Sequence, residues 1–299
     1  MALCRAPLSL HPYRTYSAAA CRRALSSSPS SSPSDVVIVS ACRTPIGSLN
    51  GQFKGMPGTA LGTAAVQSAI ERAGITGADV GEVILGNVLP AGSGQAPSRQ
   101  IALGAGIPES VPTTDVNKVC ASGMKTIMYG AQSIMLGQED VVVAGGFESM
   151  SNVPCYLPKA VPAYGHSQLL DGLLKDGLWD VYNDVHMGKC GEKAATDYSI
   201  GRDAQDAWAL RSYERALNSL EKGLFESEIC PVTLPARRGK EPVVISVDEE
   251  PGKYQGEQKL KGLRSAFQKD GTITAANASK LNDGGKASAT RSSAMQPLL

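Results

Sequence analysis

From residue 35 onward, short apolar runs of strand length alternate with longer segments whose apolar residues recur at helical spacing. The strand-like runs lie at 36–41, 82–89, 113–119, 140–146 and 242–250. The helix-like segments lie at 59–74, 97–106, 122–137 and 202–223. Chains with this alternation place parallel strands side by side and cover both faces of the sheet with the connecting helices. We therefore predict an α/β fold with a mostly parallel sheet between helices.

Residues 154–200 break the alternation, because prolines, glycines and short apolar clusters are mixed there. This composition predicts an inserted loop or cap. Further along, the stretch 271–285 is rich in small residues and turn formers, which suits a backbone that approaches a ligand closely. We expect one domain over residues 35–285, in which 154–270 includes the inserted loop or cap.

The composition excludes two classes of partner. The formal net charge is +1, and no block of basic residues is interleaved with aromatic ones, so we expect no nucleic-acid partner. No apolar run approaches the ~18–20 residues that span a bilayer, so we expect no membrane partner.

The seven cysteines form no CxxC pair and show no spacing typical of a zinc site. We expect reduced thiols and no covalent cofactor.

The first 34 residues differ in composition from the rest. They contain four arginines and many serines, and no acidic residue occurs before Asp35. Segments of this kind direct proteins to mitochondria. We therefore predict that residues 1–34 are a targeting segment and that the protein is located in the mitochondrial matrix. A disordered N-terminal tail is the alternative.

The segment VNKVCASGMK, residues 116–125, places Cys120 between a predicted strand and a predicted helix. The first turn of a helix has unpaired N–H groups and a partial positive charge, which stabilise a thiolate. Ala121, Ser122 and Gly123 are small, so a substrate carbonyl can reach the sulfur, and backbone N–H groups can hold a developing oxyanion. These features suit a nucleophile. By position alone, however, a buried structural cysteine is favoured, because such cysteines are common in protein cores.

The residues around Cys120 resemble the thiolase family. The run VNKVCASGMKTIMYGAQSI (116–134) is followed by VVVAGGFESMSNVP (141–154), and further matching motifs stand in the order that thiolases have. These are RTPIG (43–47), GNVLPAGSGQAPSRQ (86–100), VHMG (185–188) and TAANASKLNDG (274–284). The resemblance is specific, because several independent motifs agree over residues 35–284. Within the family, the chain most resembles the mitochondrial branch that acts on acetyl-CoA.

The resemblance implies an α/β thiolase N-terminal domain and a two-step acyl transfer. Cys120 would attack the thioester of acetyl-CoA, giving an acetyl-enzyme and free CoA. A second acetyl-CoA would then take up the acetyl group to form acetoacetyl-CoA, and the reverse reaction would cleave acetoacetyl-CoA with CoA. A covalent intermediate divides one difficult transfer into two easier steps. The family also implies a homo-oligomer, a tetramer.

Further site residues are implied by the same resemblance. His186 and Met187 match positions that line the acyl and pantetheine end of the pocket, and Tyr213, Lys259 and Ser279 match positions that contact CoA. Plainer interpretations are a packing role for Tyr213 and a solvated charge for Lys259. The stretch PGKYQGEQ, residues 251–258, departs from the family's usual CoA contact segment, so recognition of the adenine end is not implied.

A potassium site is implied as well. It would use Tyr213 together with Ala275, Ala276 and Ala278, mostly through backbone carbonyls, which suit a weakly hydrated cation. The alternative for the three alanines is a tight turn without a ligand.

The chain departs from the family after Gly285. Thiolases continue with an apolar strand and a second domain of the same fold, whereas residues 286–299 read KASATRSSAMQPLL. We predict a C-terminally shortened chain with a divergent polar tail over 286–299, an open sheet edge and an exposed apolar face. The family's Gly-His-Pro histidine, Asn-Glu-Ala-Phe segment and second cysteine belong to the second domain, so turnover is expected to be weak or absent.

Two alternative functions fit these residues. The first is a non-catalytic partner or regulator that associates with full-length thiolase subunits through residues 86–105 and 113–120. The second is a decarboxylating condensing enzyme of fatty-acid or polyketide synthesis, which also places a cysteine at the start of a helix. The motifs GGFESMSNVP (145–154) and NASKLNDG (277–284) favour the thiolase interpretation over this second alternative.

Overall fold

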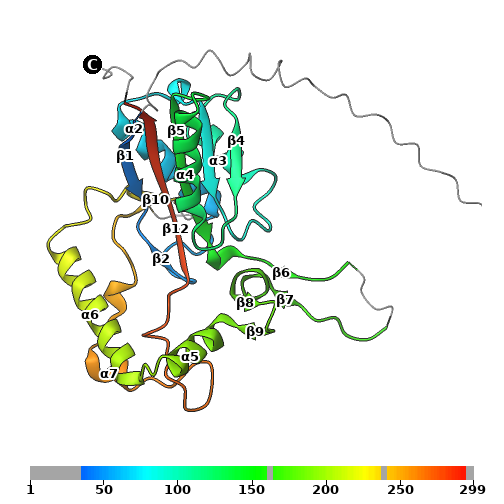
Figure 1. Ribbon diagram of the computed structural model, residues 1–299, viewed down its shortest axis with the longest axis vertical. Coiled ribbons are helices and arrows are strands. Elements are labelled where there is room, and N and C mark those ends of the chain that lie inside the picture. Colours follow the sequence, from blue (N-terminus) through cyan, green and yellow to red (C-terminus); the bar gives the residue numbers. More distant parts are fainter. Residues whose placement is uncertain (1–34, 160–163, 237–240, 294–299) are drawn as a thin grey trace, which may run out of the picture. The chain divides into compact units, whose positions relative to one another are not determined.

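A six-stranded sheet brings together strands from the beginning, the middle and the end of the described chain (Figure 1). Its order is β1 (Val36–Arg43), β12 (Asn282–Ser292), β5 (Val141–Ser149), β3 (Glu82–Gly86) and β4 (Thr113–Val116), and β2 (Gly47–Ser48) pairs with the beginning of β12. β3 is parallel to both β4 and β5, whereas β12 is antiparallel to its neighbours β1 and β5. The sheet is therefore mixed, with one antiparallel strand inside an otherwise parallel array.

The computed structural model describes residues 35–159, 164–236 and 241–293. They belong to a unit that begins at Asp35. The predicted targeting segment, residues 1–34, lies outside the described residues. Among the helices of the described part, none combines the length and the apolar character that crossing a membrane requires.

Helices cover both faces of the sheet, as predicted. α2 (Gly58–Ala73) and α3 (Pro97–Gly104) pack on one face, and α4 (Ser122–Met135) packs on the other. Side chains alternate between the two faces of a strand. Accordingly, Val83 and Leu85 of β3 join the core cluster under α2 and α3, whereas Ile84 packs with Ile134 of α4. The helix over 59–74 also ends as its sequence predicts, because Gly74 adopts a left-handed φ of 67°.

The prediction of a divergent tail from residue 286 onward and an open sheet edge is wrong, because a strand continues past Gly285. Residues 286–292 continue β12 between β1 and β5, with Ala287 and Ala289 in the core cluster shared with α2. Ser288 and Thr290, on the opposite face, are buried as well. Helices cover both faces of this strand, so small side chains fit there, and small side chains show no hydrophobic alternation. β12 therefore closes the edge that was expected to be open, and only 294–299 of the predicted tail lies outside the described residues.

Two glycines allow the neighbouring backbone of α2 and of β5 to approach β12 closely. A Cβ atom on Gly285 would lie 2.8 Å from the carbonyl oxygen of Leu61 in α2. A Cβ atom on Gly145 would lie 2.1 Å from the carbonyl oxygen of Lys286. Both neighbouring atoms belong to the backbone and cannot rotate away, so no larger residue fits at either position without a shift of the chain.

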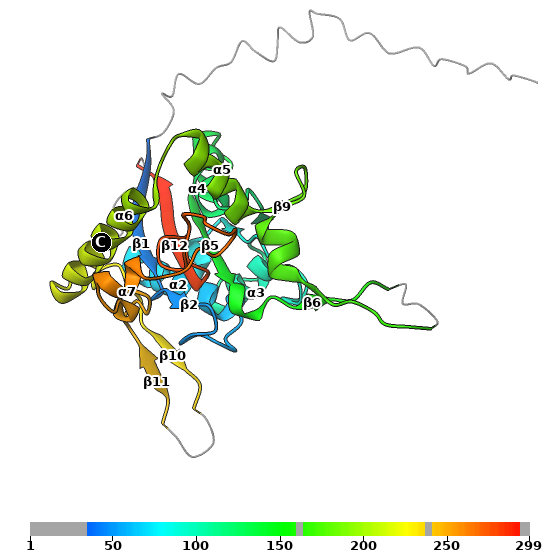
Figure 2. The same ribbon diagram turned by 90° about the horizontal axis from the view of Figure 1, so that it is seen from below.

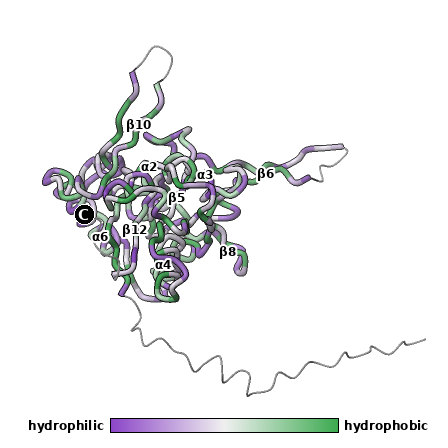
Figure 3. The backbone as a smooth tube through the Cα atoms, turned by 90° about the horizontal axis from the view of Figure 1, so that it is seen from above, coloured by the Kyte–Doolittle hydropathy of each residue, from purple (hydrophilic) through white to green (hydrophobic). Residues whose placement is uncertain are grey.

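α4 turns small residues toward the sheet and leaves apolar side chains exposed. Its buried residues include Ser122, Thr126, Gly130 and Ser133. Three methionines of the predicted apolar side are exposed: Met124 by 66%, Met128 by 49% and Met135 by 52%. Hydrophobic and hydrophilic stretches accordingly alternate along this helix (Figure 3). An exposed apolar face was expected, and on α4 it is found.

The predicted loop or cap consists of short elements. Two small antiparallel pairs, β6 (Cys155–Tyr156) with β7 (Leu170–Asp171) and β8 (Trp179–Asp180) with β9 (Val185–His186), enclose the one-turn helix η3 (Leu173–Leu178), and α5 (Met187–Asp197) follows. The chain continues with α6 (Arg202–Glu221), then β10 (Val232–Leu234) and β11 (Val243–Ile245), which form a hairpin (Figure 2). Short helical turns complete the fold: η1 (Gly77–Asp79), η2 (Met150–Asn152), η4 (Pro251–Lys253) and α7 (Glu257–Lys261).

Candidate active site

Cys120 lies on the turn between β4 and α4, at the carboxyl edge of the parallel strands. β4 ends at Val116 and α4 begins at Ser122. The side chain of Cys120 is exposed and its thiol is free, which excludes the alternative of a buried structural cysteine. Ligand sites of open α/β sheets lie at this edge. The structure thus presents the thiol where a substrate can reach it.

The turn before Cys120 is strained and is held by hydrogen bonds. Val119 has a φ of 51°, a left-handed conformation that costs a β-branched residue of order 1–3 kcal/mol. The hydroxyl of Ser122 donates to the carbonyl of Val119 at 2.6 Å and accepts from the N–H of Lys118 at 2.8 Å. The N–H of Val119 donates to Asn117 Oδ1 at 2.9 Å. These bonds fix the backbone conformation that turns Cys120 outward.

The first turn of α4 supplies the electrostatic environment of the thiol. Its N-cap residue, Ala121, has no side chain that can bond to the helix N–H groups. The start of the helix therefore keeps its partial positive charge near Cys120. A Cβ atom on Gly86 would lie 2.7 Å from the backbone nitrogen of Gly123, so the glycine of β3 lets this helix terminus sit directly on the sheet.

A buried carboxyl group, which was not predicted as a site residue, lies at the same sheet edge. Glu148, near the end of β5, accepts hydrogen bonds from the N–H groups of Val88 and Leu89 at 2.9 Å and 3.2 Å, and from Asn87 Nδ2 at 2.8 Å. Burial raises the pKa of this carboxyl, although the three hydrogen bonds act in the opposite direction. Sequence periodicity does not reveal Glu148, because only the folded structure shows that its carboxyl is buried and bonded to residues 87–89.

A small cavity of about 80 Å³ adjoins Glu148 and Asn87 and is lined also by Phe147 and Asn152. The Oδ1 atom of Asn87 is buried and has no hydrogen-bond partner among the described residues. A buried amide oxygen of this kind is normally satisfied by water or by a ligand donor. The cavity is far smaller than the ~300–1,000 Å³ of a typical ligand pocket, so it has room for a few water molecules but not for a whole CoA thioester.

His186 and Met187 stand at the start of α5. His186 is the N-cap residue: its Nδ1 accepts a 2.9 Å hydrogen bond from the N–H of Gly188, and its ring stacks on Phe267 at 4.9 Å. Since Nδ1 is engaged, Nε2 is the nitrogen left for a ligand. Met187 is 42% exposed. The structure thus gives His186 a fixed orientation and leaves Met187 accessible.

The residues predicted to bind CoA are in two different situations. Tyr213, on α6, stacks on Tyr254 with a centroid distance of 5.2 Å, and its hydroxyl donates to Glu250 Oε1 at 3.1 Å. Lys259, on α7, is exposed and hydrogen-bonded to Gln255, and Ser279 is exposed. Tyr213 is therefore part of a fixed polar cluster, whereas Lys259 and Ser279 are surface groups free to meet a ligand.

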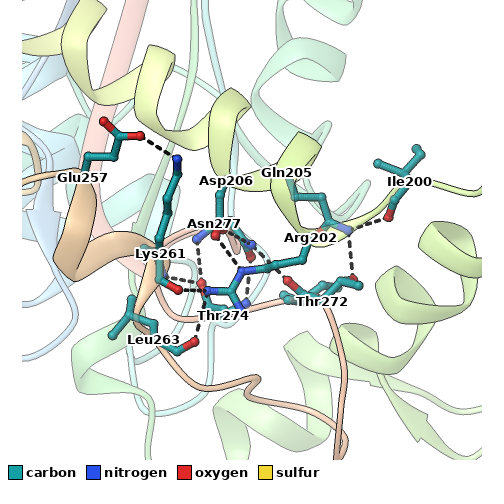
Figure 4. A network of polar contacts seen from close by, with 12 residues as sticks. Ile200, Arg202, Gln205, Asp206, Glu257, Lys261, Leu263, Thr272, Thr274 and Asn277 are labelled. Atoms are coloured by element: carbon teal, nitrogen blue, oxygen red, sulfur yellow. Dashed lines mark hydrogen bonds and ion pairs between the residues drawn. The ribbon is translucent and has the colours of Figure 1, made fainter.

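The loop that carries Ala275, Ala276 and Ala278 is anchored by two buried carboxylates, those of Asp206 and Glu192. Figure 4 shows the contacts of the first, Asp206. Asp206 of α6 binds Arg202 at 2.7 Å and accepts from Asn277 Nδ2 at 2.8 Å. Glu192 of α5, only 3% exposed, accepts from the N–H groups of Thr272 and Ile273 at 2.9 Å each. α5 and α6 thus hold the small-residue loop in one conformation.

Comparison with known proteins identifies the fold. The model of the thiolase N-terminal domain matches residues 36–291. The chain belongs to the thiolase family. The match includes β12 as far as Arg291, so this strand is part of the thiolase domain despite its polar sequence.

Curated thiolases are similar over most of this chain. The mitochondrial acetyl-CoA acetyltransferase of Mus musculus is 54% identical over 254 residues, which are 85% of this chain and 59% of the relative. The mitochondrial acetyl-CoA acetyltransferase A of Xenopus laevis is 52% identical over 254 residues, 85% of this chain and 60% of the relative. The chain spans about 60% of the length of these relatives.

Solved thiolase structures have the same fold. The Acat5 thiolase of Ascaris suum in complex with coenzyme A superimposes with a TM-score of 0.81 at 42% identity, covering 87% of this chain and 66% of that one. The acetyl-CoA acetyltransferase of Bacillus anthracis gives a TM-score of 0.84 at 38% identity, covering 89% and 68% of the two chains. The predicted thiolase-like α/β fold is confirmed.

Proposed function

We propose that this thiolase chain transfers acetyl groups from acetyl-CoA through a thioester on Cys120. The Cys120 thiolate attacks the thioester carbonyl, and the tetrahedral intermediate places its negative oxygen near the start of α4. When the intermediate collapses, a carbon–sulfur bond to Cys120 has formed and the bond to CoA has broken. The CoA thiolate leaves and takes up the proton that Cys120 gave away. The exposed thiol on a strained turn before a helix carries this proposal.

The acetyl group then passes to the α-carbon of a second acetyl-CoA: a carbon–carbon bond forms, the thioester bond to Cys120 breaks, and the α-proton goes to the released thiolate. The product is acetoacetyl-CoA, and the reverse reaction cleaves acetoacetyl-CoA with CoA. This assignment rests on similarity to relatives named acetyl-CoA acetyltransferase and to a thiolase in complex with coenzyme A. His186, Met187, Tyr213, Lys259 and Ser279 are proposed to contact the CoA thioester. The proposed setting is the mitochondrial matrix, in a homo-oligomer.

Acylation is tested with purified chain and radiolabelled acetyl-CoA. The expected result is label retained on the protein after denaturation and an equal amount of CoA released. Cys120→Ser should abolish the label, because the hydroxyl is a far weaker nucleophile at neutral pH, while Cys155→Ser should leave it unchanged. Equal labelling of the parent chain and Cys120→Ser would overturn the proposal.

A non-catalytic role as a partner of longer thiolase subunits is the second candidate. Exposed apolar residues favour it: Leu103 of α3 is 44% exposed, Val119 is 60% exposed and Met124 of α4 is 66% exposed. Leu103 and Val119 belong to the two segments predicted to mediate association, 86–105 and 113–120. Co-purification with a full-length thiolase, together with absence of label on Cys120, would favour this role over acyl transfer.

A further inference from the structure

Three different groups converge on the ammonium of Lys280. Its Nζ atom lies 2.6 Å from the carbonyl oxygen of Ala275 and 3.0 Å from Glu250 Oε1. It also lies 5.8 Å from the centroid of the Tyr213 ring, within the range of a cation–π interaction. A carbonyl, a carboxylate and an aromatic face thus surround one positive charge.

Two of these groups are the ones predicted to hold potassium. Ala275 would offer its carbonyl oxygen to that ion and Tyr213 would lie beside it, yet both already face the ammonium of Lys280. A second unit charge within about 4 Å of the first is repelled by roughly 1–4 kcal/mol. The residues present therefore do not fit a potassium ion in addition to this lysine.

We propose that the Lys280 ammonium supplies the monovalent cation of this loop in place of a potassium ion. The cation is then part of the chain and its occupancy does not depend on the salt in solution. The inference concerns the loop alone and holds whether or not Cys120 is acylated.

The electrostatic surroundings keep this lysine charged. Burial acts against the ammonium, but the contacts with Tyr213 and Glu250 outweigh burial and raise the pKa of Lys280. Glu250 is bound in turn by Ser48, whose hydroxyl donates to Oε2 at 2.8 Å. Through Glu250, the charge of Lys280 connects the alanine loop to β2 of the main sheet. A cation at this point therefore stabilises the position of the loop.

The test is thermal unfolding of the full chain in chlorides of potassium, sodium and tetramethylammonium at equal ionic strength. The parent chain should have the same Tm in all three salts. Lys280→Ala removes the charge and leaves space beside the Ala275 carbonyl, so its lowered Tm should recover by about 2–4 °C in potassium only. Lys280→Met fills that space with an uncharged chain, so its loss should not be recovered.

Lys193→Ala is the matched control, because Lys193 is an exposed lysine that forms an ion pair with Asp197 within the same helix. It should show no dependence on the cation. A potassium-specific rise of the parent Tm would overturn the proposal, and this result is decisive even if Lys280→Ala fails to fold. Equal responses of Lys280→Ala to potassium and tetramethylammonium would also overturn it.

Discussion

The hydroxyl of Ser122 donates a 2.6 Å hydrogen bond to the carbonyl oxygen of Val119, bracketing the residue that carries the exposed thiol. The backbone N–H of Ser122 donates to the same oxygen at 3.0 Å. Val119 keeps its left-handed φ of 51° under this double constraint. The conformational strain at Val119 is therefore offset by the hydrogen bonds that Ser122 donates, and Cys120 is held at the apex of the turn.

Replacement of Val119 by glycine should stabilise the chain. Glycine adopts a left-handed φ without steric cost, and the relief of strain exceeds the extra entropy of glycine in the unfolded chain, leaving a gain of about 1 kcal/mol. Val181→Gly is the control, since Val181 is also exposed, by 66%, but has no left-handed φ. Urea unfolding should show a higher midpoint for Val119→Gly and a lower one for Val181→Gly. A lower midpoint for both variants would show that Val119 is not strained.

Gly145→Ala should prevent correct pairing of β5 with β12. The added Cβ atom would lie 2.1 Å from a backbone oxygen of β12, so the two strands must separate, and we expect a loss of at least about 3 kcal/mol of unfolding free energy. Gly252→Ala is the control, because a Cβ atom there has no neighbour within 4 Å. If Gly145→Ala unfolds at the same urea concentration as Gly252→Ala, β12 does not occupy the centre of the sheet.

Glu192→Gln should loosen the small-residue loop. All the groups around this carboxylate are donors, the N–H groups of Thr272 and Ile273 and the hydroxyl of Thr272. The amide of glutamine turns one acceptor into a donor, which should cost about 2 kcal/mol. Glu257→Gln serves as the control, since its ion pair with Lys261 is exposed to solvent and such surface pairs contribute little to stability. Hydrogen exchange at Thr272 and Ile273 should accelerate in Glu192→Gln alone.

The contribution of Glu192 should disappear in acid. Burial acts to raise its pKa, but the hydrogen bonds from Thr272 and Ile273 outweigh burial and hold the pKa below the ordinary value of 4.5. A carboxyl whose folded-state pKa is lowered stabilises the fold above its unfolded pKa, and this stability is lost as the pH falls through the folded pKa. The difference in unfolding free energy between the parent and Glu192→Gln should therefore shrink between neutral pH and roughly pH 3. A difference that stays constant over this range would contradict the role assigned to the carboxylate.

Much of the sheet could be predicted because its strands are apolar and regularly spaced by helices. β1, β3, β4 and β5 all lie within the ranges predicted from these patterns or extend them by a few residues. The part of β12 after Gly285 could not be predicted, since its buried residues are alanine, serine and threonine. Burial between two helix layers selects for small size at these positions, and size alone gives no periodic signal.

The site residues likewise include some that the sequence predicts and some that only the folded structure reveals. The position of Cys120 follows from its place between a strand and a helix, and the motifs around it are specific. Lys280 looks like a surface lysine in the sequence, and Glu192 and Glu148 look like ordinary helix and strand carboxylates. Their roles depend on groups brought together from distant parts of the chain, such as Tyr213 and Ala275 around Lys280, so sequence patterns do not reveal them.

The central claim is that the position of Cys120, and not exposure alone, makes its thiol reactive toward an acyl-CoA. Cys155 is the internal comparison, because it is also exposed and free but lies within strand β6 and not on a turn that leads directly into a helix. Peptide mapping after brief treatment of the folded chain with labelled acetyl-CoA tests the claim most directly. The predicted result is label on the peptide that contains Cys120 and none on the peptide that contains Cys155. Label on both peptides at equal rates, or on neither, would contradict the claim.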